Sequence, residues 1–245
     1  MSNLSHSFGN EKVAPEERQR RIREMFGRIA SRYDLMNDLM SLGIHRLWKR
    51  DLAWAVDPRA GQCVVDLAGG TGDVARLLTV PDCEVIVCDP SVPMMNKGRS
   101  RGEKTLGWLA GAGEALPFRN NAVDTLTIAF GLRNVTHVET TLREILRVLK
   151  PGGRLLCLEF SRPRPWLRGT YNTFSRLVIP RLGGWVARDP AAYHYLVESI
   201  RRFPDQREMK TLFKRAGFVE VYYKDLSFGI ACIHIGTKPD HASAE

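Results

Sequence analysis

A short apolar run that breaks into a glycine-rich turn is the feature that most constrains how this chain can fold. The run 63–67 carries Asp66 near its end, the turn contains Gly70, Thr71 and Gly72, and a helical pattern of apolar residues follows from Val74. This order predicts a strand, a loop and a helix. Glycines in such a loop let the backbone approach a ligand closely, and the N–H groups at the start of the helix face that ligand. The segment is therefore expected to form half of a nucleotide-binding α/β fold.

A second apolar run, 84–89, also ends in an acid, Asp89. An acid at the tip of the second strand is placed to accept hydrogen bonds from both hydroxyls of a ribose. The glycine spacing is not the G-x-G-x-x-G of dinucleotide-binding proteins, and no G-x-x-x-x-G-K-[ST] loop is present. Asp66 would repel a pyrophosphate but suits the ammonium group of a methionine moiety, directly or through water. The pattern resembles the first motif of Rossmann-like methyltransferases and predicts S-adenosylmethionine as the cofactor.

Along the rest of the chain, strand-like and helix-like apolar patterns alternate. This alternation predicts an α/β fold with a mostly parallel sheet and helices on both faces. The resemblance of the glycine loop to the methyltransferase motif implies the Rossmann-like class I methyltransferase form of this fold, with seven strands and a helical N-terminal cap. The last two strands are separated by only a few residues, so they should be antiparallel, because a parallel crossover needs about a dozen residues or more. The expected strands are 63–67, 84–89, 107–110, 123–130, 154–160, 219–225 and 230–236.

Helices are expected from residue 15, where Ile22, Met25, Phe26 and Ile29 share one face and arginines the other, and at 34–40, 45–56, 135–149, 193–200 and 206–215. A further helix should follow Ser91 as its N-cap, and Pro151-Gly152-Gly153 should close the helix 135–149. We therefore divide the chain into a disordered N-terminus (1–15), a helical cap (16–60), a methyltransferase domain (61–238) with a basic, aromatic insert (162–203), and a free tail (239–245).

The net charge of +9 indicates anionic partners, either nucleic acid or an anionic membrane surface. Between Arg162 and Arg181 there are five arginines and no acid, and aromatic residues such as Trp166 and Tyr171 lie among them. This mixture is typical of a surface that lies on lipid headgroups. No apolar run is long enough to span a bilayer, and the first residues have no signal-peptide core. The five cysteines form no C-x-x-C pair, so we expect buried thiols in a reducing compartment and no metal site.

Several stretches are similar to the quinone C-methyltransferases of ubiquinone and menaquinone biosynthesis. The resemblance extends from about residue 21 to 237, and it is most specific in two segments, YDLMND with SLGIHRLWK, and FGLRNVTH. EALPF (114–118), the LKPGG segment within 147–161, and YLVESIRRFPDQ (195–206) add to it. The resemblance implies methyl transfer from S-adenosylmethionine to a ring carbon of a polyprenylated benzoquinol or naphthoquinol, without indicating which ring.

Such a reaction needs a group that stabilises a phenolate and a base for the ring proton. Arg133 and Asn134 follow the fourth strand at its carboxyl end, where open α/β sheets bind ligands, so we assign them to catalysis. Arg133, always charged, would stabilise phenolate and orient a water, although a surface salt bridge is the alternative. Tyr33, from the cap, is expected to contact the quinol oxygen, and His45 is a weaker candidate for the base.

The resemblance also implies which residues contact the cofactor, namely the acid at the end of the first strand and seven further positions. Ala112 departs from this pattern, because relatives have an acid or Asn there that reaches the adenine amino group. The adenine would then be held by backbone, by packing of Pro90 or Met94, or by Glu114. The cofactor residues implied by the resemblance are Asp66, Gly70, Thr71, Gly72, Asp89, Ala112, Gly113 and Ala129.

Two other functions compete with this interpretation. An RNA methyltransferase fits the positive charge, but FGLRN lacks the N/D-P-P-F/Y loop of base amino methylation and no RNA-binding module is recognisable. A non-catalytic scaffold is disfavoured because the loop glycines and Asp89 are intact. The expected partners are a polyprenylated quinol, an anionic membrane surface, and a quinone-biosynthesis complex or a second copy of the chain, without nucleic acid. The expected location is the cytoplasm, with peripheral association to the inner membrane.

Overall fold

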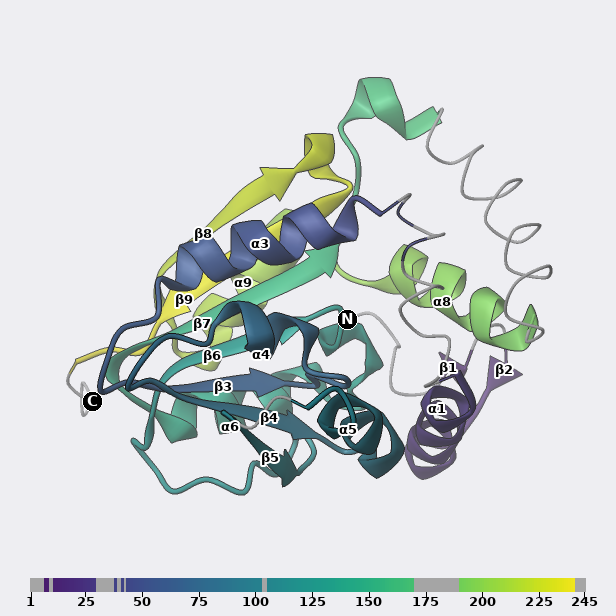
Figure 1. Ribbon diagram of the computed structural model, residues 1–245. Helices are drawn as coiled ribbons and strands as arrows, with labels where there is room; N and C mark the ends of the chain where they lie inside the picture. The colour runs from purple at the N-terminus through teal and green to yellow at the C-terminus, as the bar shows by residue number, and fades with distance from the viewer. Residues whose placement is uncertain are drawn as a thin grey trace.

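The computed structural model of the protein describes residues 7–8, 11–29, 38, 41, 43–102, 105–169 and 190–240. Within these residues the main sheet has seven strands in the order β5-β4-β3-β6-β7-β9-β8 (Figure 1). The strands from β5 to β7 are parallel to their neighbours, and β9 is antiparallel to β7 and β8. The expected seven-stranded, mostly parallel sheet and its antiparallel last pair are thus confirmed. The strands are β3 (Cys63–Leu67), β4 (Glu84–Asp89), β5 (Leu106–Ala110), β6 (Val123–Ala129), β7 (Leu149–Phe160), β8 (Val219–Leu226) and β9 (Ala231–Thr237).

Helices cover both faces of this sheet (Figure 1). Successive strand side chains point to opposite faces, so Val64 packs with α3 and α4 while its neighbour Val65 packs with α6 and α9. A strand covered on both faces needs apolar side chains on each, which explains the nearly continuous apolar runs in the sequence. The helices are α1 (Pro15–Ile29), α3 (His45–Val56), α4 (Asp73–Leu77), α5 (Val92–Arg99), η2 (Leu132–Asn134), α6 (Val138–Val148), α8 (Pro190–Arg202), α9 (Gln206–Ala216) and η3 (Ser227–Gly229).

Two short antiparallel strands, β1 (Ser7–Phe8) and β2 (Glu11–Lys12), precede α1. The expectation that residues 1–15 are disordered is wrong for these strands. A two-stranded hairpin is at best marginally stable alone in water, so tertiary contacts must hold it. The Phe8 ring stacks on Tyr195 of α8 with 4.7 Å between ring centroids, and the Arg21 guanidinium lies 5.7 Å from the centre of the Phe8 ring.

The segment after α6 also differs from expectation. Residues 151–153 do not close the helix; they lie inside β7, where the pairing with β6 shifts register between Val123 and Thr125. Gly152 has a φ of 72°, and a Cβ on Gly153 would lie 2.7 Å from the Lys150 carbonyl oxygen. Glycines at both positions therefore allow an irregular strand to continue in the sheet where other residues would end it.

Two described helices, α1 and α3, fall within the expected helical cap, and they have different roles. α3 packs directly on the sheet, with Trp48, Leu52 and Val56 buried in the same core as Val64. It therefore forms part of the layer that covers the sheet, whereas α1 lies at the carboxyl edge of the sheet, as α8 does (Figure 1). Several expected features lie outside the described residues: Tyr33, nearly all of the helix at 34–40, residues 170–189 of the insert and residues 241–245 of the tail. Among the described helices, none combines the length and the apolar character needed to cross a membrane.

Candidate active site

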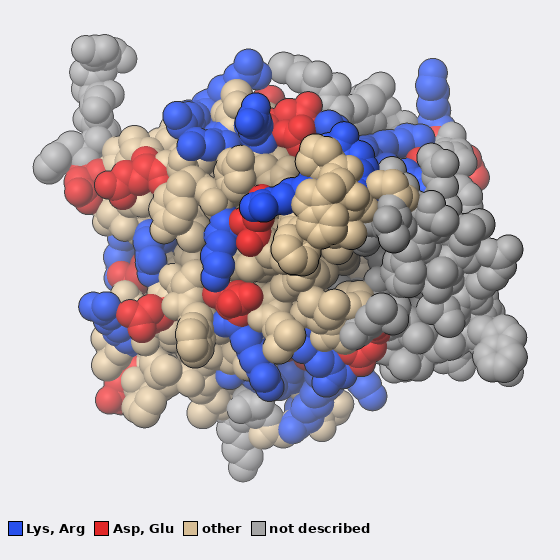
Figure 2. Space-filling view, turned by 90° about the horizontal axis from the view of Figure 1, so that it is seen from above, with Lys and Arg blue, Asp and Glu red and all other residues tan. Residues whose placement is uncertain are grey.

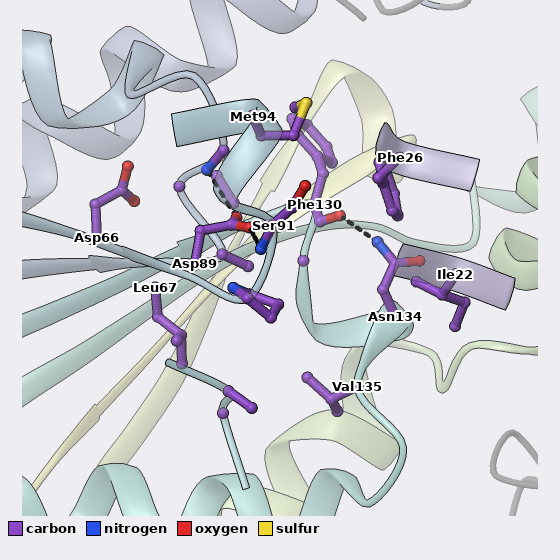
Figure 3. A pocket seen from close by; sticks show the side chains of 18 of the residues that line it. Ile22, Phe26, Asp66, Leu67, Asp89, Ser91, Met94, Phe130, Asn134 and Val135 are labelled. Carbon is purple, nitrogen blue, oxygen red and sulfur yellow. Dashed lines mark hydrogen bonds between the residues drawn. The ribbon is translucent and has the colours of Figure 1, made fainter. Parts of the chain in front are cut away.

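A pocket of about 1090 Å³, its open mouth included, lies at the carboxyl ends of β3, β4 and β6. Its walls come from the loops that follow these strands and from α1, which crosses above them (Figure 3). This is the edge at which open α/β sheets bind ligands. Seven of the eight expected cofactor residues line the pocket; Gly72 is the exception.

The glycine loop between β3 and α4 supplies the floor of this pocket. Gly70 has a φ of 56°, and a Cβ there would lie 3.1 Å from Met94 Cε, so a side chain would enter the ligand space. Gly72 has a φ of 78° and precedes α4, and its Cβ would lie 2.9 Å from the Trp108 ring. Gly72 is therefore required for close packing beneath the loop, whereas Gly70 keeps the loop open to a ligand.

Asp89 stands at the centre of the pocket, at the end of β4 (Figure 3). Its Oδ2 accepts a hydrogen bond from the Gly70 N–H at 2.9 Å, and its Oδ1 accepts one from the Ser91 N–H at 2.7 Å. Burial raises the pKa of this carboxyl to about 6, while the two backbone hydrogen bonds favour the charged form. The side chain is thus oriented with one lone pair on each oxygen left for a ligand.

Asp66 is more deeply placed than its position in the motif suggests. Its Oδ1 accepts a hydrogen bond from the Thr127 hydroxyl at 2.8 Å, and its Oδ2 accepts one from the Ala75 N–H at 3.2 Å. Burial raises its pKa to about 7, and these hydrogen bonds and the nearby Lys49 oppose the shift. Through these two hydrogen bonds the carboxylate joins β3 to β6 and α4. A cation in the pocket would favour its charged form, as the predicted ammonium contact requires.

A group of charged side chains beside Asp66 was not singled out from the sequence. The Lys49 ammonium lies 3.1 Å from Asp73 Oδ2, and Arg76 and Arg101 contact Asp73 Oδ1 at 3.2 and 2.8 Å. Lys49 and Asp73 both line the pocket. These cations, Lys49 above all, lower the pKa of Asp73 to about 2 against the effect of its burial. The excess of positive charge makes this edge suitable for a carboxylate.

At the opposite end, the structure defines what surrounds the position of Ala112. Pro90 and Met94 line the pocket together with Ala112, Gly113 and Glu114. Glu114 Oε1 already accepts hydrogen bonds from two backbone N–H groups, those of residues 136 and 137, at 2.6 and 3.2 Å. Pro90 and Met94 therefore lie where they can pack against an adenine ring, which is one of the three arrangements expected from the sequence.

The loop after β6 carries the two residues assigned to catalysis, and the structure separates them. Asn134 lines the pocket, and its Nδ2 donates a hydrogen bond to the Phe130 carbonyl at 3.3 Å (Figure 3). Arg133 is not among the lining residues, and its side chain is 3% exposed. Phe130 has a φ of 56°, a strained conformation for an aromatic residue, and such strain persists only where surrounding contacts hold it.

Arg133 is one source of those contacts, beside Asn134 and the rings of Trp48 and Phe160. Its Nη1 donates to the Phe130 carbonyl at 2.6 Å and to Glu159 Oε2 at 2.8 Å, while its backbone N–H donates to Glu159 Oε1 at 3.2 Å. The guanidinium also lies 5.5 Å from the centre of the Phe160 ring. Burial raises the pKa of Glu159, and Arg133 opposes this shift. The salt bridge that was the alternative expectation for Arg133 is therefore present, but it is buried and not on the surface. Arg133 lies behind the pocket, where it supports the loop, and is not part of the lining.

Arg18 of α1 is another residue that sequence reasoning misplaced. We expected the arginines of α1 to face solvent, yet Arg18 is 1% exposed. Its guanidinium donates to the carbonyl oxygens of Arg133, Asn134 and Val135 at 3.1, 3.2 and 2.9 Å. The signal was present, because Arg18 precedes Ile22 by four residues and so lies on the apolar face.

His45 lies at the start of α3 with its Nδ1 2.8 Å from the Ser41 hydroxyl. Burial, together with Lys49, lowers its pKa to about 4, so the imidazole is neutral near pH 7. It is not among the lining residues of the pocket, and the structure does not bring it beside Asn134. Tyr33 lies outside the described residues, and its assignment stays a prediction.

The part of the pocket next to Asn134 is mainly apolar, although α1 also contributes Gln19 and Arg23 to the lining. Ile22 and Phe26 project from α1, and Phe130 and Val135 face them from the loop after β6 (Figure 3). The pocket therefore has a polar half around Asp89 and an apolar half that begins at Asn134. This arrangement suits two ligands that meet between the halves.

The polar half fits S-adenosylmethionine on grounds independent of the sequence motif. The Ser91 hydroxyl is buried next to Asp89, lines the pocket and has no hydrogen-bond partner within the described residues. Ser91 precedes α5, but its side chain makes no capping hydrogen bond there. An unsatisfied buried hydroxyl, an oriented carboxylate and a glycine whose Cβ would intrude together form a cradle for a polar ligand.

Sequence comparison identifies a family and several similar proteins. A model of the ubiE/COQ5 methyltransferase family matches residues 13–238. A Rubrivivax gelatinosus protein named ubiquinone/menaquinone biosynthesis C-methyltransferase UbiE is 59% identical over 235 residues, which cover 96% of this chain and 94% of that protein. A protein of the same name from Cereibacter sphaeroides is 47% identical over 245 residues, covering 97% and 98% of the two chains.

Solved structures share the fold at much lower sequence identity. A Thermotoga maritima protein described as an S-adenosylmethionine-dependent methyltransferase, possibly a histamine N-methyltransferase, superposes with a TM-score of 0.65 at 22% identity, over 89% of this chain and 99% of that one. The [4+2]-cyclase SpnF superposes with a TM-score of 0.64 at 15% identity, over 89% and 95%. These likenesses support the fold, which hosts more than one type of reaction.

Proposed function

Because this chain belongs to the ubiE/COQ5 methyltransferase family, we propose that it transfers a methyl group from S-adenosylmethionine to a ring carbon of a polyprenylated quinol in ubiquinone or menaquinone biosynthesis. The structural observation that carries this proposal is the division of one pocket into two halves. The polar half presents Asp89 to a ribose, and the apolar half, below Ile22 and Phe26, offers space for a ring with an isoprenoid tail. The similar proteins are named as quinone-biosynthesis enzymes, so an RNA methyltransferase is not favoured.

The cofactor supplies a methyl group already activated on a sulfonium, so the protein mainly has to position the ring carbon and make it nucleophilic. Asp89, Ser91 and the loop N–H groups would hold the adenosine part, and Lys49 would face the methionine carboxylate. Asn134, between the halves, would donate a hydrogen bond to a ring oxygen and stabilise negative charge there. Arg133 acts through the loop by holding Phe130, with its charge balanced by Glu159.

We also propose that the protein collects its substrate at an anionic membrane surface. Among the described residues of the insert, Trp166 is 65% exposed and packs edge-on against Phe228, which is 57% exposed. Exposed aromatic side chains beside arginines favour lipid headgroups. Part of the charge in this segment is neutralised within the protein, because Arg162 contacts Asp205 at 3.2 Å. The aromatic pair is therefore the stronger support for membrane contact.

Co-sedimentation with vesicles tests this membrane proposal. The full-length protein should bind vesicles that contain anionic lipid at low salt, and the double variant W166S/F228S should bind several-fold less. The variant W54S is the matched control, because Trp54 is 86% exposed but lies on the outer face of α3. Equal binding by all three proteins would contradict the assignment of the surface, and no binding by the wild type would contradict membrane association.

Quinone profiling of a strain without this gene tests the main function. We expect quinones that lack one ring methyl group to accumulate, and the intact gene to restore the normal quinones. A gene that carries D89N should restore them poorly, because the variant binds the cofactor weakly. Normal quinones in the deletion strain, with no second gene for the same step, would refute the proposed function. The ring that lacks its methyl group would also identify the substrate as a benzoquinol, a naphthoquinol or both.

A further inference from the structure

The side chain of Asn134 is held by residues from two helices that are distant in sequence. The hydroxyl of Tyr195, on α8, donates a hydrogen bond to Asn134 Oδ1 at 3.0 Å. Arg18, on α1, donates from Nη2 to the Tyr195 oxygen at 3.5 Å. Tyr195 is 2% exposed, and burial raises the pKa of its phenol. A protonated tyrosine therefore lies between a fixed cation and the amide of Asn134.

These contacts determine which way the amide of Asn134 faces. The Phe130 carbonyl can only accept a hydrogen bond, so the NH₂ group of Asn134 must face it. The Tyr195 oxygen already accepts from Arg18, so its own proton points to Asn134 Oδ1. Both ends of the amide are thus specified independently. The oxygen is directed to Tyr195, and the second N–H of the NH₂ group is left for a ligand in the pocket.

We propose that Tyr195 and Arg18 are positioning residues that fix the amide of Asn134, so that it presents an N–H donor to an oxygen of the quinol ring. This inference rests on the proposed function and adds the direction of the hydrogen bond and the residues that impose it. A donor stabilises the charge that develops on a ring oxygen when its proton leaves, whereas an amide flipped by 180° would present an acceptor and repel it. The direction of this amide consequently affects catalysis more than binding.

The same contacts couple the site to the N-terminal segment. Phe8 of β1 stacks on the Tyr195 ring, and the guanidinium of Arg18 also binds the backbone of the Asn134 loop. Removal of the Tyr195 hydroxyl leaves these ring and backbone contacts in place. The variant Y195F therefore tests the hydroxyl separately from the docking of α1 and α8.

The test is a double-mutant cycle measured with the full-length enzyme, S-adenosylmethionine and a quinol that lacks the ring methyl group. Y195F should lower kcat by about 10-fold to 100-fold, and N134A by about 100-fold or more. In the N134A background, Y195F should change kcat by no more than about twofold, because the group it orients is gone. The Kd of S-adenosylmethionine should stay within about twofold in each variant. Y222F, on the 52% exposed Tyr222, is the matched control and should resemble the wild type.

Two results would overturn the inference. One is a kcat of Y195F within about twofold of the wild type; the other is an equal loss from Y195F in both backgrounds, as expected of a general structural defect. N134D gives a second test that does not depend on the folding of Y195F. Its carboxylate keeps the acceptor for Tyr195 but has no N–H donor, so it should lose nearly as much kcat as N134A. Retained activity in N134D would contradict the donor role. If the wild type makes no methylated quinol, the proposed function itself fails.

Discussion

Replacement of Asp89 by asparagine tests the cofactor half of the site most directly. The carboxylate is held by the N–H groups of Gly70 and Ser91, at 2.9 and 2.7 Å, so each oxygen faces a donor. In D89N the new NH₂ group must face one of these N–H groups, and the charge that strengthens hydrogen bonds to ribose hydroxyls is lost. The change removes one negative charge and leaves the shape of the side chain nearly the same.

The magnitude follows from the bonds that are lost. A hydrogen bond to a charged group contributes about 1.5 to 3 kcal/mol, and the carboxylate is oriented to accept two from a ribose. Since part of this energy is offset by hydration in the free protein, we expect a loss of about 3 kcal/mol, which raises the Kd of S-adenosylmethionine roughly 100-fold. Titration calorimetry at pH 8 measures this change.

The pH dependence provides the sharper test, because burial raises the pKa of Asp89 to about 6. The cofactor binds the ionised form, so protonation of the free protein competes with binding as the pH falls through the pKa. For the wild type, the Kd should rise by about tenfold between pH 8 and pH 5 through this group alone. In D89N this change of the Kd with pH should disappear, and any remaining pH dependence comes from other groups such as Asp66. A Kd that changes equally with pH in wild type and D89N, or that does not change with pH in either, would refute the assignment of Asp89.

Three further predictions concern the stability of the protein. E159Q removes the partner of the buried Arg133 and should lower the free energy of unfolding by about 3 to 5 kcal/mol in a urea titration; a loss below about 1 kcal/mol would contradict a buried ion pair. G98A places a Cβ against the Trp108 ring and 2.6 Å from the Thr71 carbonyl oxygen, and it should lower the free energy of unfolding by about 1 to 3 kcal/mol; an unchanged melting temperature would contradict this close packing. Burial raises the pKa of Asp66 to about 7, so the cofactor-free protein takes up protons on folding and should become more stable as the pH falls from 8 to 6.5, by at most about 1.4 kcal/mol per pH unit from this group. D66N should lack this increase in stability, and an identical change of the free energy of unfolding with pH in the two proteins would contradict the raised pKa of Asp66.

Much of the fold and half of the site follow from local patterns in the sequence. The strand, loop and helix around Gly70 are encoded by residues adjacent in the chain, and Asp89 is recognised because it ends an apolar run. The same kind of pattern identified the loop that contains Asn134. These features depend on backbone conformation and on the order of strands in a parallel sheet, both of which have strong local signatures.

The partners of the charged side chains could not be derived in this way. Glu159 is 26 residues from Arg133, and Arg18 contacts the backbone of Arg133 across 115 residues. A charged residue on a helix or at a strand end is exposed by default. The spacing to Ile22 places Arg18 on the apolar face of α1, but nothing local identifies the distant groups that bind its guanidinium. Only the packing of α1 and α8 against the loop after β6 decides this.

What the sequence alone determined is therefore the scaffold and the place of the ligand: a seven-stranded sheet with Asp89 at its carboxyl edge. What only the tertiary structure decided is how the loop at that edge is held, with Arg133 behind the pocket and Asn134 in it. The physical reason is that hydrogen-bond direction and burial depend on all elements that meet at a point, and here Arg18 and Tyr195 are 177 residues apart in the sequence. Burial of a cation or an amide is unfavourable unless hydrogen-bond partners offset the loss of hydration, and the periodicity of the sequence does not indicate those partners.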